Sequence, residues 1–108
     1  MIDVRWSRRT YADIRRISDH WVERDPRKVR VVIGAIRQRV NWIADGHTEV
    51  GSPVKGMPAN YHWYLERTYG YKIFYRAEGS PPTGIAVITV RHVRQRPLSP
   101  STLRKYVR

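Results

Sequence analysis

The sequence contains no cysteine among its 108 residues. A disulfide framework, a cysteine-ligated zinc site and a thiol nucleophile are therefore excluded, and the composition suits a reducing compartment. Apolar stretches are all much shorter than the about 20 residues of a bilayer-spanning helix, and Met1–Arg9 lacks the apolar core of a signal peptide. We therefore expect a cytoplasmic protein with no membrane partner, metal, cofactor or small-molecule substrate.

Acidic residues are also scarce. Nine Asp and Glu stand against 21 Lys and Arg, which gives a formal net charge of +12. Most of the basic residues are arginine, whose planar guanidinium group suits phosphate and carboxylate groups. The length fits one domain spanning residues 1–108. A charge this large on one small domain favours a nucleic acid or an acidic protein segment as partner.

Hydrophobic periodicity predicts a strand followed by two helices. Apolar and polar side chains alternate in residues 2–6, as in a half-buried strand. Ser7 is a suitable N-cap for an amphipathic helix over residues 8–24. The expected apolar face of this helix comprises Tyr11, Ile14, Ile17 or Ser18, and Trp21. Asp25 and Pro26 are typical of a second helix start. The apolar stripe that follows comprises Val29, Val32, Ile33, Ile36, Val40 and Ile43.

In the second half of the sequence, the residue pattern predicts a loop, three strands and a basic tail. Residues 46–60 are rich in Gly and Pro and indicate a loop. Strands are expected at residues 61–67, 71–76 and 85–93, with the last one in the interior of the sheet because both its faces are apolar. The tail, about residues 94–108, has five basic residues and no acidic one. The predicted class is α+β in the order β-α-α-β-β-β, with a helical hairpin on one face of a mainly antiparallel sheet and the other face partly open.

Several stretches resemble the RelE/ParE superfamily of bacterial toxins. Trp6–Ile17, with Trp6-Ser7 followed by Ala12-Asp13-Ile14, is similar to the family's first strand and helix. The loop Gly51–Gly56 resembles the connection before the second strand. The run Tyr71–Arg76, followed by Ile85–Arg96 with its basic, histidine-containing end, resembles the C-terminal half. Together these stretches cover roughly residues 2–98.

The resemblance implies the toxin of a type II toxin–antitoxin system, associated with plasmid stabilization and growth inhibition. ParE-like members act on DNA gyrase, whereas RelE-like members are ribosome-dependent mRNA endonucleases. The segment Val90–Pro97 is slightly closer to ParE-like chains. The family's Arg-x-Leu pattern early in the second strand is replaced by Trp63-Tyr64-Leu65, and the nearest arginine is Arg67. We therefore expect ParE-like action, with endonuclease activity as the alternative; the choice decides whether the chain is an enzyme.

RNA cleavage through the 2′-hydroxyl needs a general base, a general acid and cations. For that activity the candidate catalytic residues are His92, Arg94, Arg67 and Glu66, with His62 and Tyr75 as further acid–base candidates. Candidate contacts to a target or nucleic acid are Lys72, Arg76, Arg91, Arg96 and Trp63. From the alternation along strands we expect one open face to carry Tyr64, Glu66, Lys72, Phe74 and Arg76. Structural interpretations stand beside these, with Glu66 as an ion-pair partner of a neighbouring cation and Tyr75 as a core aromatic.

The basic charge also predicts the neutralising partner. A disordered, acidic antitoxin segment that folds on binding would suit a groove across the helices and the sheet edge, and the charge would speed encounter. A different class stays open: a basic nucleic-acid-binding module without toxicity. Aromatic residues that could stack on bases are interleaved with its cations, although no recognised nucleic-acid-binding signature is present. These aromatic residues are Tyr61, Trp63, Tyr64, Tyr69 and Tyr71.

Overall fold

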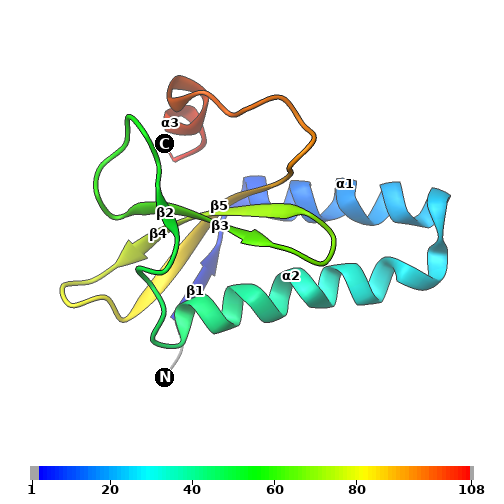
Figure 1. Cartoon of the computed structure of the whole chain (residues 1–108), viewed down its shortest axis with the longest axis horizontal. Helices are drawn as coiled ribbons and strands as arrows, with labels where there is room; N and C mark the ends of the chain where they lie inside the picture. The colour runs from blue at the N-terminus through cyan, green and yellow to red at the C-terminus, as the bar shows by residue number, and fades with distance from the viewer. Residues whose placement is uncertain (1–2, 108) are drawn as a thin grey trace.

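The computed structural model describes residues 3–107, which form helices around a five-stranded sheet (Figure 1). The elements are β1 (Asp3–Trp6), α1 (Arg8–Arg24), the short 3₁₀ helix η1 (Pro26–Lys28), α2 (Val29–Ala44), β2 (Ser52–Pro53), β3 (Tyr61–Glu66), β4 (Tyr71–Glu78), β5 (Gly84–His92) and α3 (Pro100–Tyr106). The predicted α+β order is confirmed, with β2 added inside the expected loop. Ile2 and Arg108, the expected ends of the first strand and of the tail, lie outside the described residues.

The sheet has the strand order β1-β5-β4-β3-β2. β1 pairs with β5 in parallel, and every other neighbouring pair is antiparallel, so the prediction of a mainly antiparallel sheet is confirmed. β5 has a neighbour on each side, as its apolar faces predicted. Residues 3–107 include no helix with the length and apolar character that crossing a bilayer requires.

The predicted cap at Ser7 is confirmed, but the predicted start of the second helix was wrong. Asp25 caps the short helix η1, and α2 begins only at Val29, after Lys28, which makes no side-chain capping hydrogen bond. The Ser7 side chain accepts a hydrogen bond from the Thr10 backbone N–H at 3.0 Å, and the Asp25 carboxylate accepts one from the Arg27 N–H at 3.2 Å. The expected apolar face of α1 was wrong at Tyr11, which is 64% exposed. Residues are spaced by about 100° around a helix, and α1 turns Thr10, Asp13 and Ile17 toward the sheet, so Tyr11 points away from it.

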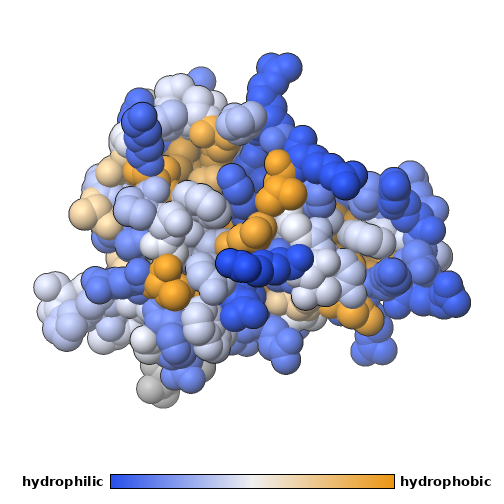
Figure 2. All heavy atoms as spheres, viewed as in Figure 1, coloured by the Kyte–Doolittle hydropathy of each residue, from blue (hydrophilic) through white to orange (hydrophobic). Residues whose placement is uncertain are grey.

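The sheet is packed on both faces. The helical hairpin covers one face with a core that includes Val32, Ile36, Val40, Ile73 and Tyr75. On the other face a second cluster joins Tyr61, Phe74, Ile88 and Leu103, the last from α3. Figure 2 shows apolar atoms gathered where α3 lies over the sheet. The expected partly open face is thus narrower than predicted, because apolar residues on both sides of β4 and β5 require cover on both faces.

Candidate functional site

The register of the sheet assigns the predicted site residues to two faces. Trp63 lies opposite Phe74, and Lys72 lies opposite both Leu65 and Arg91. Directly opposite residues share a face. Because Phe74 belongs to the cluster that α3 covers, these residues lie on the α3 side of the sheet.

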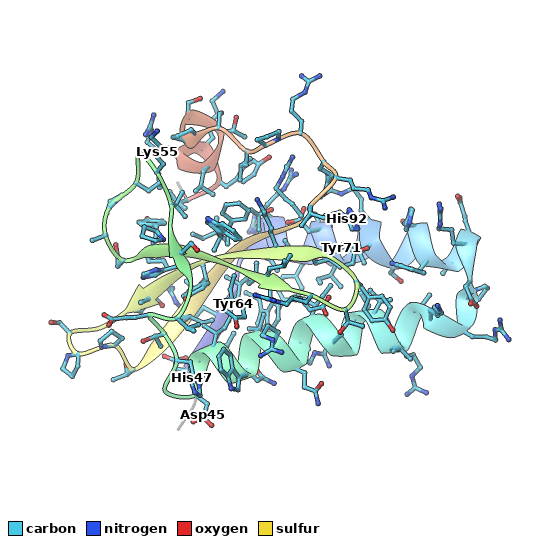
Figure 3. All side chains as sticks on the ribbon, in the orientation of Figure 1. Asp45, His47, Lys55, Tyr64, Tyr71 and His92 are labelled. Carbon is cyan, nitrogen blue, oxygen red and sulfur yellow. The ribbon has the colours of Figure 1, made fainter. Side chains whose placement is uncertain are left out.

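One sequence prediction is corrected by this register. Tyr64 and Glu66 do not share a face with Lys72, Phe74 and Arg76. An even-numbered residue of β3 always lies opposite an odd-numbered residue of β4, so residues of equal parity on the two strands point to opposite faces. Tyr64 therefore faces the helices, where its ring centroid lies 5.7 Å from that of Trp42 in α2 (Figure 3).

Three basic residues and an aromatic residue form what we call the Lys72–Arg91 surface, which comprises Trp63, Lys72, Arg91 and the adjoining Arg96. The Lys72 ammonium lies 4.4 Å from the centroid of the Trp63 ring. The Arg91 guanidinium donates to the Arg96 carbonyl oxygen at 2.8 Å. Like charges directly opposite one another on a sheet repel, so an anionic group bound here relieves that repulsion. The structure thus brings together four of the five residues expected to contact a target.

Arg76, the fifth, lies at the other end of β4. Its guanidinium donates to the Tyr61 hydroxyl at 3.2 Å and to the Glu78 carboxylate at 3.0 Å. The hydrogen bond to Tyr61, together with the one to Glu78, raises the pKa of Arg76. Glu78 also accepts from Arg5, and this hydrogen bond is the main reason that the pKa of Glu78 is lowered. Arg76 is therefore part of an ion network remote from Lys72.

The Glu66 carboxylate is buried and holds the turn between β3 and β4. Its two oxygens accept hydrogen bonds from the backbone N–H groups of Thr68 at 2.7 Å and Tyr69 at 3.0 Å. Gly70 completes the turn at a positive φ of 80°, a conformation that favours glycine. Arg67 is exposed on the same turn. The structure thus places Glu66 on turn N–H groups instead of on a neighbouring cation.

His92 ends β5 on the helix side, with its ring centroid 5.2 Å from that of Tyr71 (Figure 3). Its Nδ1 accepts from the Arg94 backbone N–H at 3.1 Å, which leaves Nε2 to donate to the Tyr69 carbonyl oxygen at 3.1 Å. Both ring nitrogens are therefore engaged with the backbone, and the imidazole joins the end of β5 to the turn that Glu66 holds.

The other two acid–base candidates hold the loop before β2. The buried His62 ring stacks on Tyr75 with centroids 5.4 Å apart, and its Nδ1 donates to the Gly51 carbonyl oxygen at 3.2 Å. The Tyr75 hydroxyl accepts from the Gly51 N–H at 3.0 Å. Burial raises the pKa of Tyr75. The structural interpretation of Tyr75 as a core aromatic is confirmed, since its side chain is fully buried.

Sequence reasoning missed a second basic site, on the helix side. A cavity of about 530 Å³ lies between α1 and the residues after β5. It is lined by Arg16, His20 and Arg24 from α1 together with Tyr71, His92 and Arg94. The four-residue spacing of Arg16, His20 and Arg24 places them in one row along a helix and is visible in the sequence. The approach of Arg94 to that row is a long-range contact that the sequence does not indicate.

Two solved structures have a similar α+β architecture. One is a chain of the chromosomal ParDE TA system from P. aeruginosa, at 19% sequence identity and a TM-score of 0.71, covering 87% of this chain and 98% of that one. The other is the YoeB/ParE toxin from Agrobacterium tumefaciens, at 19% identity and a TM-score of 0.56, covering 83% of this chain and 97% of that one. From these two matches, the chain has the RelE/ParE-like fold that the resemblance implied. No family model and no curated protein matches the sequence.

Proposed function

We propose that this chain is the growth-inhibiting, cytoplasmic toxin of a type II toxin–antitoxin system and acts on DNA gyrase. The observation that carries the proposal is the match to nearly the full length of a chain from a ParDE system. The placement of the acid–base candidates favours gyrase over message cleavage. His92, Glu66 and His62 are already hydrogen-bonded to backbone groups, which leaves their side chains less free to transfer protons. Lys72 and Arg91 lie on the other face of the sheet, the α3 side. Such a cationic surface suits binding of a target.

Two assays run side by side test the target. After induced expression we expect growth arrest, and with purified protein we expect inhibition of supercoiling by gyrase and intact ribosome-bound message. Cleavage of message in a translation-coupled assay, abolished in His92→Ala or Arg94→Ala, would instead establish the RelE-like endonuclease. Unchanged growth, together with no adjacent antitoxin gene, would exclude the toxin and favour the alternative, a basic nucleic-acid-binding module without toxicity.

The Lys72–Arg91 surface makes the first testable prediction. The double variant Lys72→Gln, Arg91→Gln is expected to weaken target binding by about tenfold or more, because hydrogen bonds from charged groups contribute about 1.5–3 kcal/mol each. Growth arrest should weaken in parallel. The matched control is Arg15→Gln, Arg30→Gln, which removes the same charge from exposed helix positions. If the control loses as much activity, the surface acts only through overall charge and the assignment fails.

An apolar groove between the helices is the proposed binding site for the antitoxin. A cavity of about 240 Å³ lies between α1 and α2, and its lining comprises Trp6, Tyr11, Ile14, Ile33, Ile36, Arg37 and Asn41. The lining is largely apolar, and Arg37 adds one cation to a chain of net charge +12. An acidic segment with apolar anchors matches both properties.

A charge at the mouth of this groove should separate neutralisation from toxicity. We expect Tyr11→Asp to weaken antitoxin binding by about 30-fold, the effect of losing an anchor of about 2 kcal/mol, while growth arrest persists. Val22→Asp is the control, since Val22 is also exposed on α1 but lies outside the groove. Antitoxin affinity by calorimetry and growth under co-expression provide the measurements. Full rescue of Tyr11→Asp by the antitoxin would exclude this groove.

A further inference from the structure

The cavity between α1 and the residues after β5 has the features of an anion site. Arg16, His20 and Arg24 line it from one side, and Arg94 lines it from the other. Its volume of about 530 Å³ falls within the about 300–1,000 Å³ typical of small-ligand sites. We propose that this cavity binds a phosphate group.

The charge of the cavity is positive and largely uncompensated. Three arginines line it against a single carboxylate, Asp13. That carboxylate is fully buried and already accepts from Arg16, Thr89 and the Val90 N–H, with Arg9 beside it. Within residues 3–107, neither Arg24 nor Arg94 makes an ion pair. Two guanidinium groups are therefore available to an anion.

The hydroxyl group of Tyr71 adds a further hydrogen-bond donor to the cavity. Tyr71 is only 4% exposed and lines the same cavity. Its oxygen accepts a hydrogen bond from the indole N–H of Trp21 at 3.0 Å, and its own proton has no acceptor among the hydrogen bonds of residues 3–107. An acceptor oxygen bound in the cavity would therefore receive a hydrogen bond from Tyr71.

The balance of donors selects phosphate over a carboxylate. A guanidinium group binds a carboxylate or phosphate bidentately, so a single carboxylate, with one charge and two oxygens, uses one arginine. A phosphate monoester carries about −1.5 to −2 charges and three acceptor oxygens at neutral pH. It can therefore engage Arg24, Arg94 and the Tyr71 hydroxyl together.

The cavity is distinct from the Lys72–Arg91 surface. Tyr71 and His92 are directly opposite each other on the helix side of the sheet, while their chain neighbours Lys72 and Arg91 point to the α3 side. The phosphate site can consequently be tested independently of the gyrase proposal. Variants of one surface should leave the other intact.

Titration of the full chain, followed by amide and indole chemical shifts, tests the site. The probes are inorganic phosphate, adenosine monophosphate, a trinucleotide with a 5′-phosphate and the same trinucleotide with a 5′-hydroxyl, all at fixed ionic strength. We expect shifts at the Trp21 indole and around residues 16–24 and 92–95. The probe that binds most tightly distinguishes free phosphate, a nucleotide and a strand end. No shifts with any phosphate probe, or shifts confined to the Lys72–Arg91 surface, would overturn the proposal.

Variants give the test its control. Arg24→Gln, Arg94→Gln is expected to raise the Kd for the best probe by about tenfold or more. Arg8→Gln, Arg15→Gln removes the same charge from exposed positions of α1 outside the cavity and should change it by less than about twofold. Tyr71→Phe should weaken binding severalfold, with a thermal melt as the check on folding. Equal losses in both double variants, or equally tight binding of a glutamate-rich peptide, would contradict a phosphate site.

Discussion

Asp13→Ala is expected to lower the free energy of unfolding by about 3 kcal/mol, since each buried donor left without its acceptor costs about 1–3 kcal/mol. The Asp13 carboxylate accepts from the Thr89 hydroxyl and from the Val90 N–H at 3.0 Å, and both donors are buried. The buried Nε of Arg9 lies 3.2 Å from the same carboxylate as an ion pair and has no hydrogen-bond partner within the described residues. One truncation thus removes the hydrogen-bond acceptor of two buried donors and the ion-pair partner of the buried Arg9 Nε.

Urea unfolding of three variants measures this effect. Asp13→Asn keeps an acceptor oxygen but loses the charge, so its loss of stability should fall between wild type and Asp13→Ala. Asp19→Ala, on an exposed position of the same helix, should stay within about 0.5 kcal/mol of wild type. If Asp13→Ala is as stable as Asp19→Ala, the carboxylate does not hold α1 against the sheet.

The position of Asp13 follows from an irregularity in the sheet. The pairing of β4 with β5 shifts between Phe74 and Tyr75, so Ile88 has no direct partner on β4. Such a bulge locally disrupts the ladder and re-aims side chains. Here it leaves Thr89 and the Val90 N–H to bond with Asp13. A carboxylate on the inner side of α1 is therefore the partner that the bulge requires.

Local patterns predicted the elements well because their causes are local. The apolar stripe of α2 and the cap at Ser7 act within a few positions, and the structure has both of them where expected. Asp13 was noticed only as part of a motif. The residues within one helical turn of Asp13 do not indicate that a bulge between β4 and β5 needs its carboxylate.

The grouping of site residues depended on register, which is a long-range property. Whether Glu66 shares a face with Lys72 depends on the length of the turn between them, and a shift of one residue would exchange the faces. The spacing of Arg16, His20 and Arg24 was available from the sequence. That they line the same cavity as Arg94 depends on the path of the chain after β5.

Gly84→Ala is expected to destabilise the protein by about 3 kcal/mol, at the upper end of overpacking costs. A Cβ added to Gly84 would lie 2.2 Å from the Asp3 carbonyl oxygen and 2.8 Å from the Asp3 Cβ. Gly84 is directly opposite Asp3 in the parallel pair of β1 and β5. Because the obstacle includes backbone, no rotation of a side chain relieves it, and β1 must move away from β5.

Gly34→Ala is the matched control, because it makes the same chemical change with the opposite expected sign. A Cβ at Gly34 meets no atom within 4 Å, and alanine in a helix interior is favoured over glycine by about 0.8–1 kcal/mol. Unfolding of both variants in urea should therefore move in opposite directions from wild type. Equal losses would mean that the β1–β5 pair tolerates a methyl group and that its close approach is not a constraint. Opposite signs would show that the space beside the glycine, rather than its intrinsic flexibility, decides the effect of each substitution.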